Sequence, residues 1–296
     1  MLFYHFGYGE HGPARAGKRL RPQLVMQAAL GEGADLEDTL DAAVAVELVH
    51  NYSLIHDDIE DRDELRRGRP TLWSAYGVAQ AINSGDAVCA ISFLALQEAV
   101  RRHPAERVLS MTTRLHEANR LMCVGQSHDI EFETAKHVDL GAYYEMIGGK
   151  TAALFAASCA LGAECAHASL ETIERYSEAG HAYGISFQIR DDILGIWSNL
   201  DATGKIGGND LARRKWTFPV VWALGQPQSP ARDVVANAYA AGSELEGKTV
   251  ERVIEALEAL GSRQAAVRAA EEPLALVERL TNAALRDFLL EGLTVS

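Results

Sequence analysis

The chain has 296 residues, 48% of them hydrophobic, which is enough apolar material for a large folded core and excludes a disordered or fibrous protein. Lys and Arg total 28 against 41 Asp and Glu, giving a formal net charge of −13, so no broad basic surface can hold a nucleic acid. The mean hydropathy of −0.08, with no run of about 18 apolar residues, predicts no membrane-spanning helix. The first residues resemble no secretion signal, so we expect a cytoplasmic protein.

Apolar residues recur at helical spacing along almost the whole chain. In residues 36–60 they are spread too widely around the helix for one exposed stripe, so this segment is predicted as a buried helix. Similar segments predict further helices at residues 78–101, 107–133, 139–162, 169–200, 217–224, 232–241, 249–259 and 263–291. No segment shows the sustained alternation of a strand, and no linker or repeat divides the chain. The sequence therefore predicts an all-α single domain over residues 1–296.

Two acidic clusters interrupt apolar helices. The first contains Asp57 and Asp61, which lie one turn apart on one helix face, and the second contains Asp191 and Asp192. Like charges this close cost free energy unless a cation compensates them. Ligation by carboxylates alone favours Mg²⁺ or Mn²⁺ over zinc, and Mg²⁺ held by few carboxylates completes its shell with water and substrate phosphate. The clusters therefore predict a phosphate ester as substrate.

Basic residues are concentrated in two segments, the second of which lies just beyond the first acidic cluster in the sequence. They occur in the segment GKRLRP at residues 17–22 and in RRGRP at residues 66–70. Arg offers phosphate two parallel hydrogen bonds and Lys offers a compact charge, so these segments are suited to an oligophosphate. The alternative is a solubilising surface patch, which accounts for the charges but not for the Gly and Pro residues that fix the backbone beside them.

The motifs in their order resemble the trans-isoprenyl diphosphate synthase, or polyprenyl synthetase, family. They run from about residue 17 to residue 220 as GKRLRP (17–22), DDIED (57–61), RRG (66–68), GGKT (148–151), FQIRDD (187–192), TGK (203–205), DL (210–211) and Lys215. The resemblance implies an isoprenoid-synthase-like helical bundle around a deep central cavity, usually as a homodimer. It also implies a Mg²⁺-dependent prenyltransferase that condenses isopentenyl diphosphate with allylic diphosphates.

The same resemblance implies a role for each matching residue. Three Mg²⁺ ions, or Mn²⁺ in their place, would be bound by Asp57, Asp61 and Asp191, supported by Asp58 and Asp192. The residues matching the allylic diphosphate site are Arg66, Lys150, Lys205 and Lys215. Those matching the isopentenyl diphosphate site are Gly17, Lys18, Arg21, His50 and Arg67. The residues matching those beside the developing carbocation are Thr151 and Gln188.

Four positions qualify the family pattern. Gly195 stands where many members have a third aspartate, which predicts weaker metal binding on that side. Gln126 and Asp129 match a polar pair of the family, and we expect both to support the site from a buried position. We expect His56 to pack or hydrogen-bond beside the metal ligands without being one of them.

Product length is predicted from the helix that carries the first acidic cluster. Tyr52 precedes Asp57 by five residues, about 7.5 Å along a helix axis, and the resemblance places it on the cavity for the growing tail. One bulky residue with the small Ser53 beside it resembles members that stop at the C20 geranylgeranyl product, with the C15 farnesyl product next. The alternative is that Tyr52 only packs between helices and another residue forms the floor.

Two other functions share part of this pattern. A class I terpene cyclase triggers the same ionisation but binds no second substrate, which leaves Lys18, Arg21 and Arg67 without a purpose. A non-catalytic subunit of a heteromeric prenyl synthase is expected to have lost the aspartates that this chain retains. Both alternatives therefore explain less of the sequence than a prenyl diphosphate synthase does.

Overall fold

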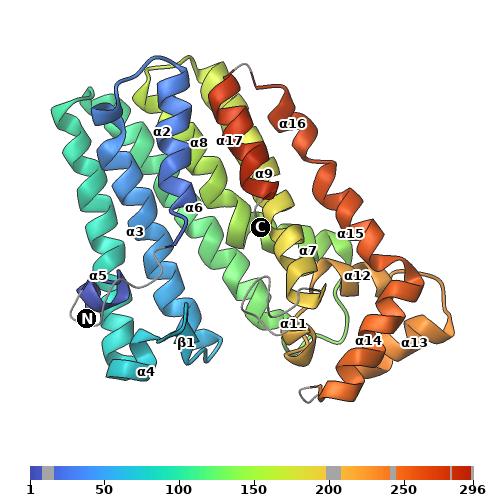
Figure 1. The fold of residues 1–296 in the computed structure, drawn as a ribbon. Coiled ribbons are helices and arrows are strands. Elements are labelled where there is room, and N and C mark those ends of the chain that lie inside the picture. The colour runs from blue at the N-terminus through green and yellow to red at the C-terminus, as the bar shows by residue number, and fades with distance from the viewer. Residues whose placement is uncertain (9–16, 198–207, 241–244, 281, 295–296) are drawn as a thin grey trace. The chain divides into compact units, whose positions relative to one another are not determined.

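The protein is almost entirely helical in the computed structural model, which describes residues 1–8, 17–197, 208–240, 245–280 and 282–294 (Figure 1). This confirms the predicted all-α fold. The chain divides into two compact units, each with its own internal contacts. The first comprises residues 1–119, 157–177 and 282–285, and the second comprises residues 120–156, 178–281 and 286–296. That one domain contains both units stays a prediction.

The first unit is built around a long central helix. Its elements are α1 (Leu2–His5), α2 (Leu20–Gly31), α3 (Leu36–Glu60), β1 (Leu65–Arg66), β2 (Arg69–Pro70), α4 (Leu72–Tyr76), α5 (Val78–Gln97), η1 (Glu98–Arg101) and the first part of α6 (Ala105–Phe132). Helix α3 contacts α2 and α5, which lie on either side of it in Figure 1. Ala42, Val46 and Val49 of α3 are fully or almost fully buried. Packing on two sides explains why the apolar positions of this helix spread so far around its surface.

A short antiparallel hairpin follows α3, where the sequence predicted only a turn. Leu65 pairs with Pro70 and Arg66 with Arg69. The two residues between the strands, Arg67 and Gly68, have φ angles of 54° and 78°. Two consecutive residues with positive φ form the turn that suits the twist of a two-stranded hairpin. The hairpin therefore presents its arginines at a defined place beyond the end of α3.

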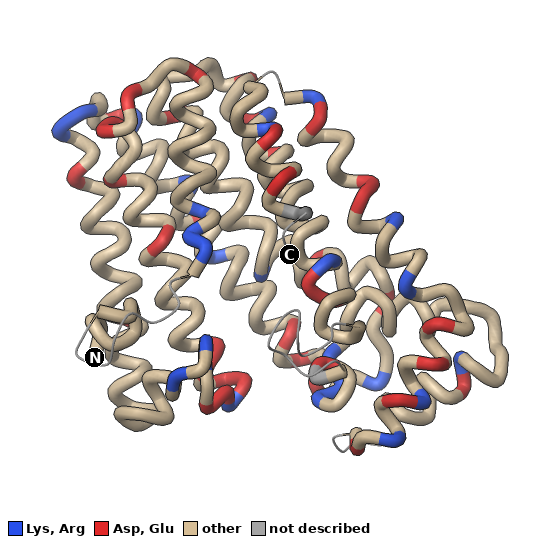
Figure 2. The backbone as a smooth tube through the Cα atoms, in the orientation of Figure 1, with Lys and Arg blue, Asp and Glu red and all other residues tan. Residues whose placement is uncertain are grey.

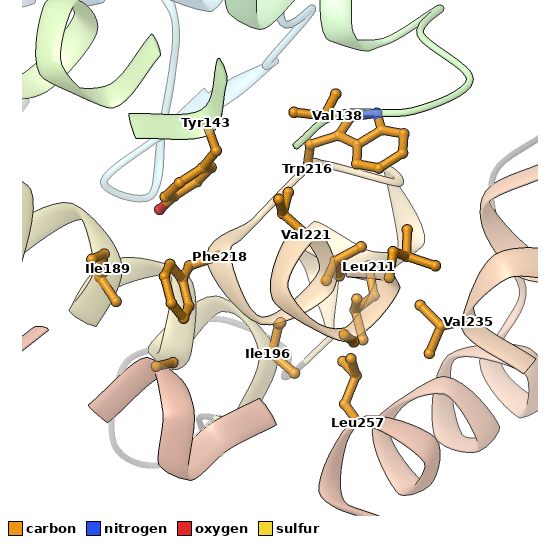
Figure 3. Close-up of a cluster of buried hydrophobic side chains, with 14 of the residues drawn as sticks. Val138, Tyr143, Ile189, Ile196, Leu211, Trp216, Phe218, Val221, Val235 and Leu257 are labelled. Atoms are coloured by element: carbon orange, nitrogen blue, oxygen red, sulfur yellow. The ribbon is translucent and has the colours of Figure 1, made fainter. Parts of the chain in front are cut away.

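The second unit packs short helices around one apolar core. Its elements are the remainder of α6, α7 (Leu140–Ile147), η2 (Gly148–Ala152), α8 (Ala153–Cys165), α9 (Leu170–Trp197), α11 (Asn209–Ala212), α12 (Phe218–Leu224), α13 (Pro230–Ala240), α14 (Gly247–Leu260), α15 (Ser262–Glu271), α16 (Leu274–Glu278) and α17 (Ala283–Thr294). Helices α8, α9 and α17 also contribute residues to the first unit. Figure 3 shows part of the core, with Tyr143, Phe218 and Leu257 in one cluster of buried side chains.

The prediction of a single amphipathic helix over residues 263–291 was wrong. The segment forms α15, α16 and α17. Pro273 stands between α15 and α16, and proline lacks the N–H that a continuous helix requires. Before α17, the Asn282 side chain accepts a hydrogen bond from the Leu285 backbone N–H at 3.0 Å, which starts a new helix. The apolar periodicity continues through these breaks, so it did not reveal them.

Two helical segments have the length and apolar composition that a membrane span requires, whereas the sequence analysis expected none. They are Val78–Arg101 and Leu140–Cys165. The most apolar part of Leu140–Cys165 is 78% buried inside the protein, as expected for a core helix, against 28% for Val78–Arg101. Two such segments are weak support for a membrane protein, because the core helices of soluble proteins share both properties.

Candidate active site

Helix α3 ends in carboxylates, and its last turn contains no basic residue. The C-terminus of a helix carries partial negative charge, so carboxylates there are unfavourable without a cation. Asp58 is only 2% exposed, and Arg66 Nε donates to Asp58 Oδ1 at 2.6 Å. Burial raises the pKa of Asp58 to about 6, and Arg66 opposes the rise. Asp57 and Asp61 are half-buried on one face of the helix end, where acidic and basic residues gather (Figure 2).

The hairpin brings Arg67 against Gly17, two residues far apart in the sequence that match the same substrate site. A Cβ on Gly17 would lie 2.5 Å from Arg67 Nη2, so a larger residue at position 17 would require the Arg67 side chain to shift. A pocket in the first unit opens beside this contact. It is lined by Tyr4, His5, Phe6, Gly7, Gly17, Arg19, Glu47, Asn51, Leu54, Asp58, Arg66, Arg67, Arg69, Pro70, Thr71 and Leu72. The pocket therefore combines clustered guanidinium groups with the buried carboxylate of the acidic motif.

Arg21 and His50 extend the basic side of this region. Arg21 Nη1 lies 3.4 Å from His50 Nε2. Burial, followed by the charges of Arg21, Arg67 and Arg66, holds the pKa of His50 well below its usual range. His50 is therefore neutral and able to accept a hydrogen bond as well as donate one. Lys18 is exposed, and its carbonyl oxygen accepts from Gln23 Nε2 at 2.8 Å.

The N-terminal segment lies on the same pocket, which the sequence analysis missed. His5 Nε2 is 3.1 Å from Asn51 Oδ1, and Asn51 Nδ2 donates to Glu47 Oε1 at 3.0 Å. Because Asn51 uses its amide N–H on Glu47, its oxygen is left to accept from neutral His5. Burial lowers the pKa of His5 to about 4. Tyr4 fixes the segment to the hairpin by donating to the Pro70 carbonyl at 2.9 Å.

In the second unit, a single turn of π-helix, η2, carries Lys150 and Thr151. Such turns displace side chains from regular helical positions and are common at functional sites. The backbone of η2 lies close to α6, because a Cβ on Gly149 would be 2.6 Å from the Leu121 carbonyl oxygen. Lys150 Nζ donates to Asp129 Oδ2 at 2.5 Å. Asp129 therefore pairs with Lys150 from a half-buried position, and Gln126, one turn earlier on α6, is half-buried as well. The supporting role expected of both residues stays a prediction.

Asp191 and Asp192 are adjacent on α9 but lie in opposite surroundings. Asp191 is exposed, whereas Asp192 is 6% exposed and accepts from Tyr143 Oη at 2.6 Å and from the Phe218 N–H at 2.8 Å. Burial raises the pKa of Asp192 to about 7, and these hydrogen bonds oppose the rise. Of the two carboxylates, Asp191 is the one that solvent and a metal ion can reach. Asp192 is instead held inside the protein by its hydrogen bonds to Tyr143 and Phe218.

The structure also brings together Thr151 and Gln188, as the resemblance implied, with Thr151 Oγ1 donating to Gln188 Oε1 at 2.7 Å. Lys215 is half-buried, and its carbonyl oxygen accepts from Tyr239 Oη at 2.8 Å. Lys205 lies outside the described residues.

Gly195 is buried directly beneath Asp210. A Cβ on Gly195 would overlap Asp210 Oδ2. The carboxylate of Asp210 therefore occupies the space in which a third aspartate side chain of the second motif would begin.

Tyr52 is buried in the first unit and hydrogen-bonded at its hydroxyl. It is 6% exposed, and its hydroxyl donates to Asn119 Oδ1 of α6. Its ring meets that of His56 edge to face at 5.7 Å, and His56 Nε2 lies 3.7 Å from Asp86 Oδ1 of α5. Ser53 donates back to the His50 carbonyl at 2.9 Å. A contact with α6 fixes Tyr52, and nothing in the sequence spacing indicated it.

Within the part of the chain that the structure describes, no three Asp, Glu, His or Cys side chains gather closely enough to hold a metal alone. This fits Mg²⁺, which proteins commonly bind through one or two carboxylates and the phosphates of the substrate. Asp57, Asp61 and Asp191 are carboxylates that solvent reaches, whereas Asp58 and Asp192 are buried with protein donors. Each unit therefore offers solvent-accessible carboxylates that are suited to a divalent ion arriving with a diphosphate.

Comparison with known proteins agrees with this chemistry. The sequence model of the family described as "Polyprenyl synthetase" matches residues 8–257. A geranylgeranyl diphosphate synthase from Mycobacterium tuberculosis is 40% identical over 276 residues, which cover 92% of this chain and 78% of that protein. A (2E,6E)-farnesyl diphosphate synthase from Mycobacterium bovis is 40% identical over 240 residues, which cover 80% of this chain and 66% of that protein.

The fold has a close structural match as well. The crystal structure of a polyprenyl synthetase from Streptomyces coelicolor A3(2) superposes with a TM-score of 0.89 at 33% identity, covering 97% of this chain and 90% of that one. Polyprenyl synthetases use divalent metal ions for their diphosphate substrates. The chain belongs to the polyprenyl synthetase family, and it is a trans-prenyltransferase.

Proposed function

We propose that the protein is a Mg²⁺-dependent synthase that condenses isopentenyl diphosphate with an allylic diphosphate to give a short-chain all-trans prenyl diphosphate. The observation that carries the proposal is the contact of Gly17 with Arg67 beside the buried Asp58–Arg66 pair. This contact brings arginine side chains to the acidic end of α3. A diphosphate is bound by cationic side chains, and its metal ions are bound by carboxylates. The similarity to named geranylgeranyl and farnesyl diphosphate synthases supports the same reaction.

Each group has a part in this reaction. Three Mg²⁺ ions, held by Asp57, Asp61 and Asp191, would supply the positive charge that neutralises the allylic diphosphate. That diphosphate is gripped by Arg66, Lys150, Lys205 and Lys215. Gly17, Lys18, Arg21, His50 and Arg67 bind isopentenyl diphosphate, and neutral His50 serves as a hydrogen-bonding group without adding charge.

The bond changes balance without a nucleophile from the protein. The allylic carbon–oxygen bond breaks, and the diphosphate leaves with the electron pair. The double bond of isopentenyl diphosphate then attacks the allylic cation and forms the new carbon–carbon bond. A proton passes from the condensed product to the departing diphosphate. Thr151 and Gln188 direct oxygen atoms toward the cation, and such preorganised dipoles lower the barrier to its formation.

We place the end of the product tail at Tyr52, with the C20 product favoured and the C15 product second. The two relatives named above are both 40% identical to the chain, so overall similarity does not choose between their products. The choice therefore depends on side chains at the cavity floor. Tyr52 is buried on α3, and its hydroxyl bond to Asn119 of α6 fixes the position of the ring.

A homodimer would cover the apolar side chains that are exposed along α5. Val78, Ile82, Ile91 and Leu94 are each at least 43% exposed, and Leu109 at the start of α6 is 68% exposed. Apolar residues gathered along one helix mark a protein contact more often than isolated ones do. We expect Leu94→Glu to convert the dimer to a monomer in sedimentation analysis. Leu170→Glu, at a leucine of α9 that is 72% exposed against 60% for Leu94, should leave the dimer intact.

The decisive experiment incubates the purified protein with Mg²⁺, isopentenyl diphosphate and allylic diphosphates of five, ten or fifteen carbons, and identifies the products by mass spectrometry. We expect a linear C20 diphosphate, and no product when the metal is chelated. A cyclic hydrocarbon formed from an allylic diphosphate alone would show a terpene cyclase. A protein that is inactive alone but alters the products of an active synthase would be a non-catalytic subunit.

A further inference from the structure

We propose that Tyr143 and Asp192 are positioning residues that fix the direction of the Gln188 side-chain amide. The proposal rests on the proposed function, in which Gln188 and Thr151 lie beside the developing allylic cation. It gives a purpose to a buried tyrosine that no motif contains.

These residues form one continuous series of hydrogen bonds within the second unit. Tyr143 Oη of α7 donates to Asp192 Oδ2 at 2.6 Å. Gln188 Nε2, one turn before Asp192 on α9, donates to Asp192 Oδ1 at 3.0 Å. Thr151 Oγ1 of η2 donates to Gln188 Oε1 at 2.7 Å. The buried Tyr143 is thereby connected through Asp192 to Gln188 and Thr151, the two side chains assigned to the allylic cation.

The series has a direction because of the carboxylate. Both oxygens of Asp192 accept hydrogen bonds, Oδ2 from Tyr143 and the Phe218 N–H and Oδ1 from Gln188 Nε2, so the carboxyl group receives the NH₂ end of the Gln188 amide. The two ends of an amide are almost equal in size, and only their hydrogen-bond partners decide which way the group points. With its nitrogen on Asp192, Gln188 turns its oxygen toward Thr151. The oxygen end attracts a cation and the nitrogen end repels it, so this choice bears directly on the barrier.

Tyr143 keeps Asp192 in place. Its side chain is 1% exposed, and its ring meets that of Phe218 edge to face at 5.9 Å within the core shown in Figure 3. The Phe218 backbone N–H donates to the same carboxylate oxygen at 2.8 Å. A rigid ring and a backbone group thus hold one oxygen of Asp192 and leave the other for Gln188.

The test compares Tyr143→Phe and Asp192→Asn with a matched control, Tyr144→Phe. Tyr144 is the next residue, 37% exposed, and its ring also lies 6.2 Å from that of Phe218. The assays measure kcat, the KM of each substrate, the Mg²⁺ dependence and the fraction of allylic substrate released as prenyl alcohol. The alcohol forms when the carbon–oxygen bond has broken and water, losing a proton, bonds to the carbon in place of isopentenyl diphosphate.

We expect kcat to fall about 100-fold in Asp192→Asn and about tenfold in Tyr143→Phe, with a larger alcohol fraction and little change in either KM, because preorganised dipoles act on the transition state. Tyr144→Phe should match the wild type. In a Gln188→Ala background, Tyr143→Phe should have no further effect on kcat, because it acts through Gln188.

Three results would overturn the proposal. The first is a wild-type kcat and a wild-type alcohol fraction in both variants. The second is recovery of kcat in both variants at high Mg²⁺. The third is a further tenfold loss of kcat when Tyr143→Phe is added to Gln188→Ala. Thermal unfolding of each variant shows whether it folds. If Asp192→Asn does not fold, the test is made with Tyr143→Phe. A wild-type protein that forms no prenyl diphosphate would contradict the proposed function instead.

Discussion

The two aspartate motifs each bury one carboxylate, but the protein stabilises the two by different means. Asp58 faces the guanidinium of Arg66, whereas Asp192 is held by the hydroxyl of Tyr143 and a backbone N–H. Burial raises the pKa of both, to about 6 for Asp58 and about 7 for Asp192. A charged partner on a short hairpin suits a region that exchanges charged ligands. Neutral donors from a rigid core suit a region that orients other side chains.

The largest expected effect comes from removing the exposed carboxylates of either motif. Asp57→Ala, Asp61→Ala and Asp191→Ala should each lower kcat by about 100-fold or more and leave the melting temperature almost unchanged, because each removes a metal ligand and no core contact. Steady-state turnover over a range of Mg²⁺ concentrations is the measurement. Glu60→Ala, which removes the same charge from the exposed end of α3, is the control. Near-normal turnover of all three variants would discard the metal assignment.

A smaller effect should separate the two diphosphate sites. Arg67→Ala should raise the KM of isopentenyl diphosphate about 10- to 100-fold, and Lys215→Ala should raise that of the allylic diphosphate by a similar factor, because a hydrogen bond to a charged group contributes about 1.5–3 kcal/mol. Initial rates with one substrate varied and the other saturating distinguish the sites. If both variants affected both substrates equally, the division between the sites would be wrong.

Replacing Tyr52 should change the product more than the rate. Tyr52→Ala removes the buried ring and should lengthen the product by about one five-carbon unit, because a tail limited by steric exclusion grows into the opened space. Tyr52→Phe retains the ring but loses the hydrogen bond to Asn119, so it measures the contribution of the hydroxyl. Product distributions at identical substrate ratios provide the comparison. An unchanged distribution in an active Tyr52→Ala enzyme would show that another residue forms the floor, and a wild-type product of C30 or longer would contradict the short-chain assignment.

The smallest effect is a pH dependence at the N-terminal segment. Burial lowers the pKa of His5 to about 4 from a usual 6.5, so the unfolded chain takes up the proton first as the pH falls. Stability from this group is complete above pH 6.5 and is lost progressively down to about pH 4, by at most about 3 kcal/mol. Hydrogen exchange of residues 1–8 between pH 7 and pH 4 measures the loss. The glutamine in His5→Gln does not titrate in this range. If hydrogen exchange in that variant still accelerated as the pH fell, the effect would belong to another group.

Periodicity predicted the helices well but could not rank neighbouring residues. Residues 36–60 form one buried helix as expected, and α9 carries the second acidic cluster. The spacing placed Asp57 and Asp61 on one helix face, but it did not show that Asp58 is buried and paired with the hairpin arginine Arg66. Tyr143 and Asn119 carry no charge and follow no motif, so their partners emerged only from the packing of helices. The roles of the predicted site residues stay predictions until the substitutions above are measured.

The close approach of Gly195 and Asp210 makes these two positions interdependent in evolution and in protein engineering. A side chain added at position 195 overlaps the carboxylate at position 210, so Gly195→Asp alone crowds two like charges into one buried space. Exchanging the residues at both positions moves a carboxylate from α11 to α9 without adding one. We therefore expect Gly195→Asp to be tolerated better with a smaller residue at position 210 than with Asp210 in place.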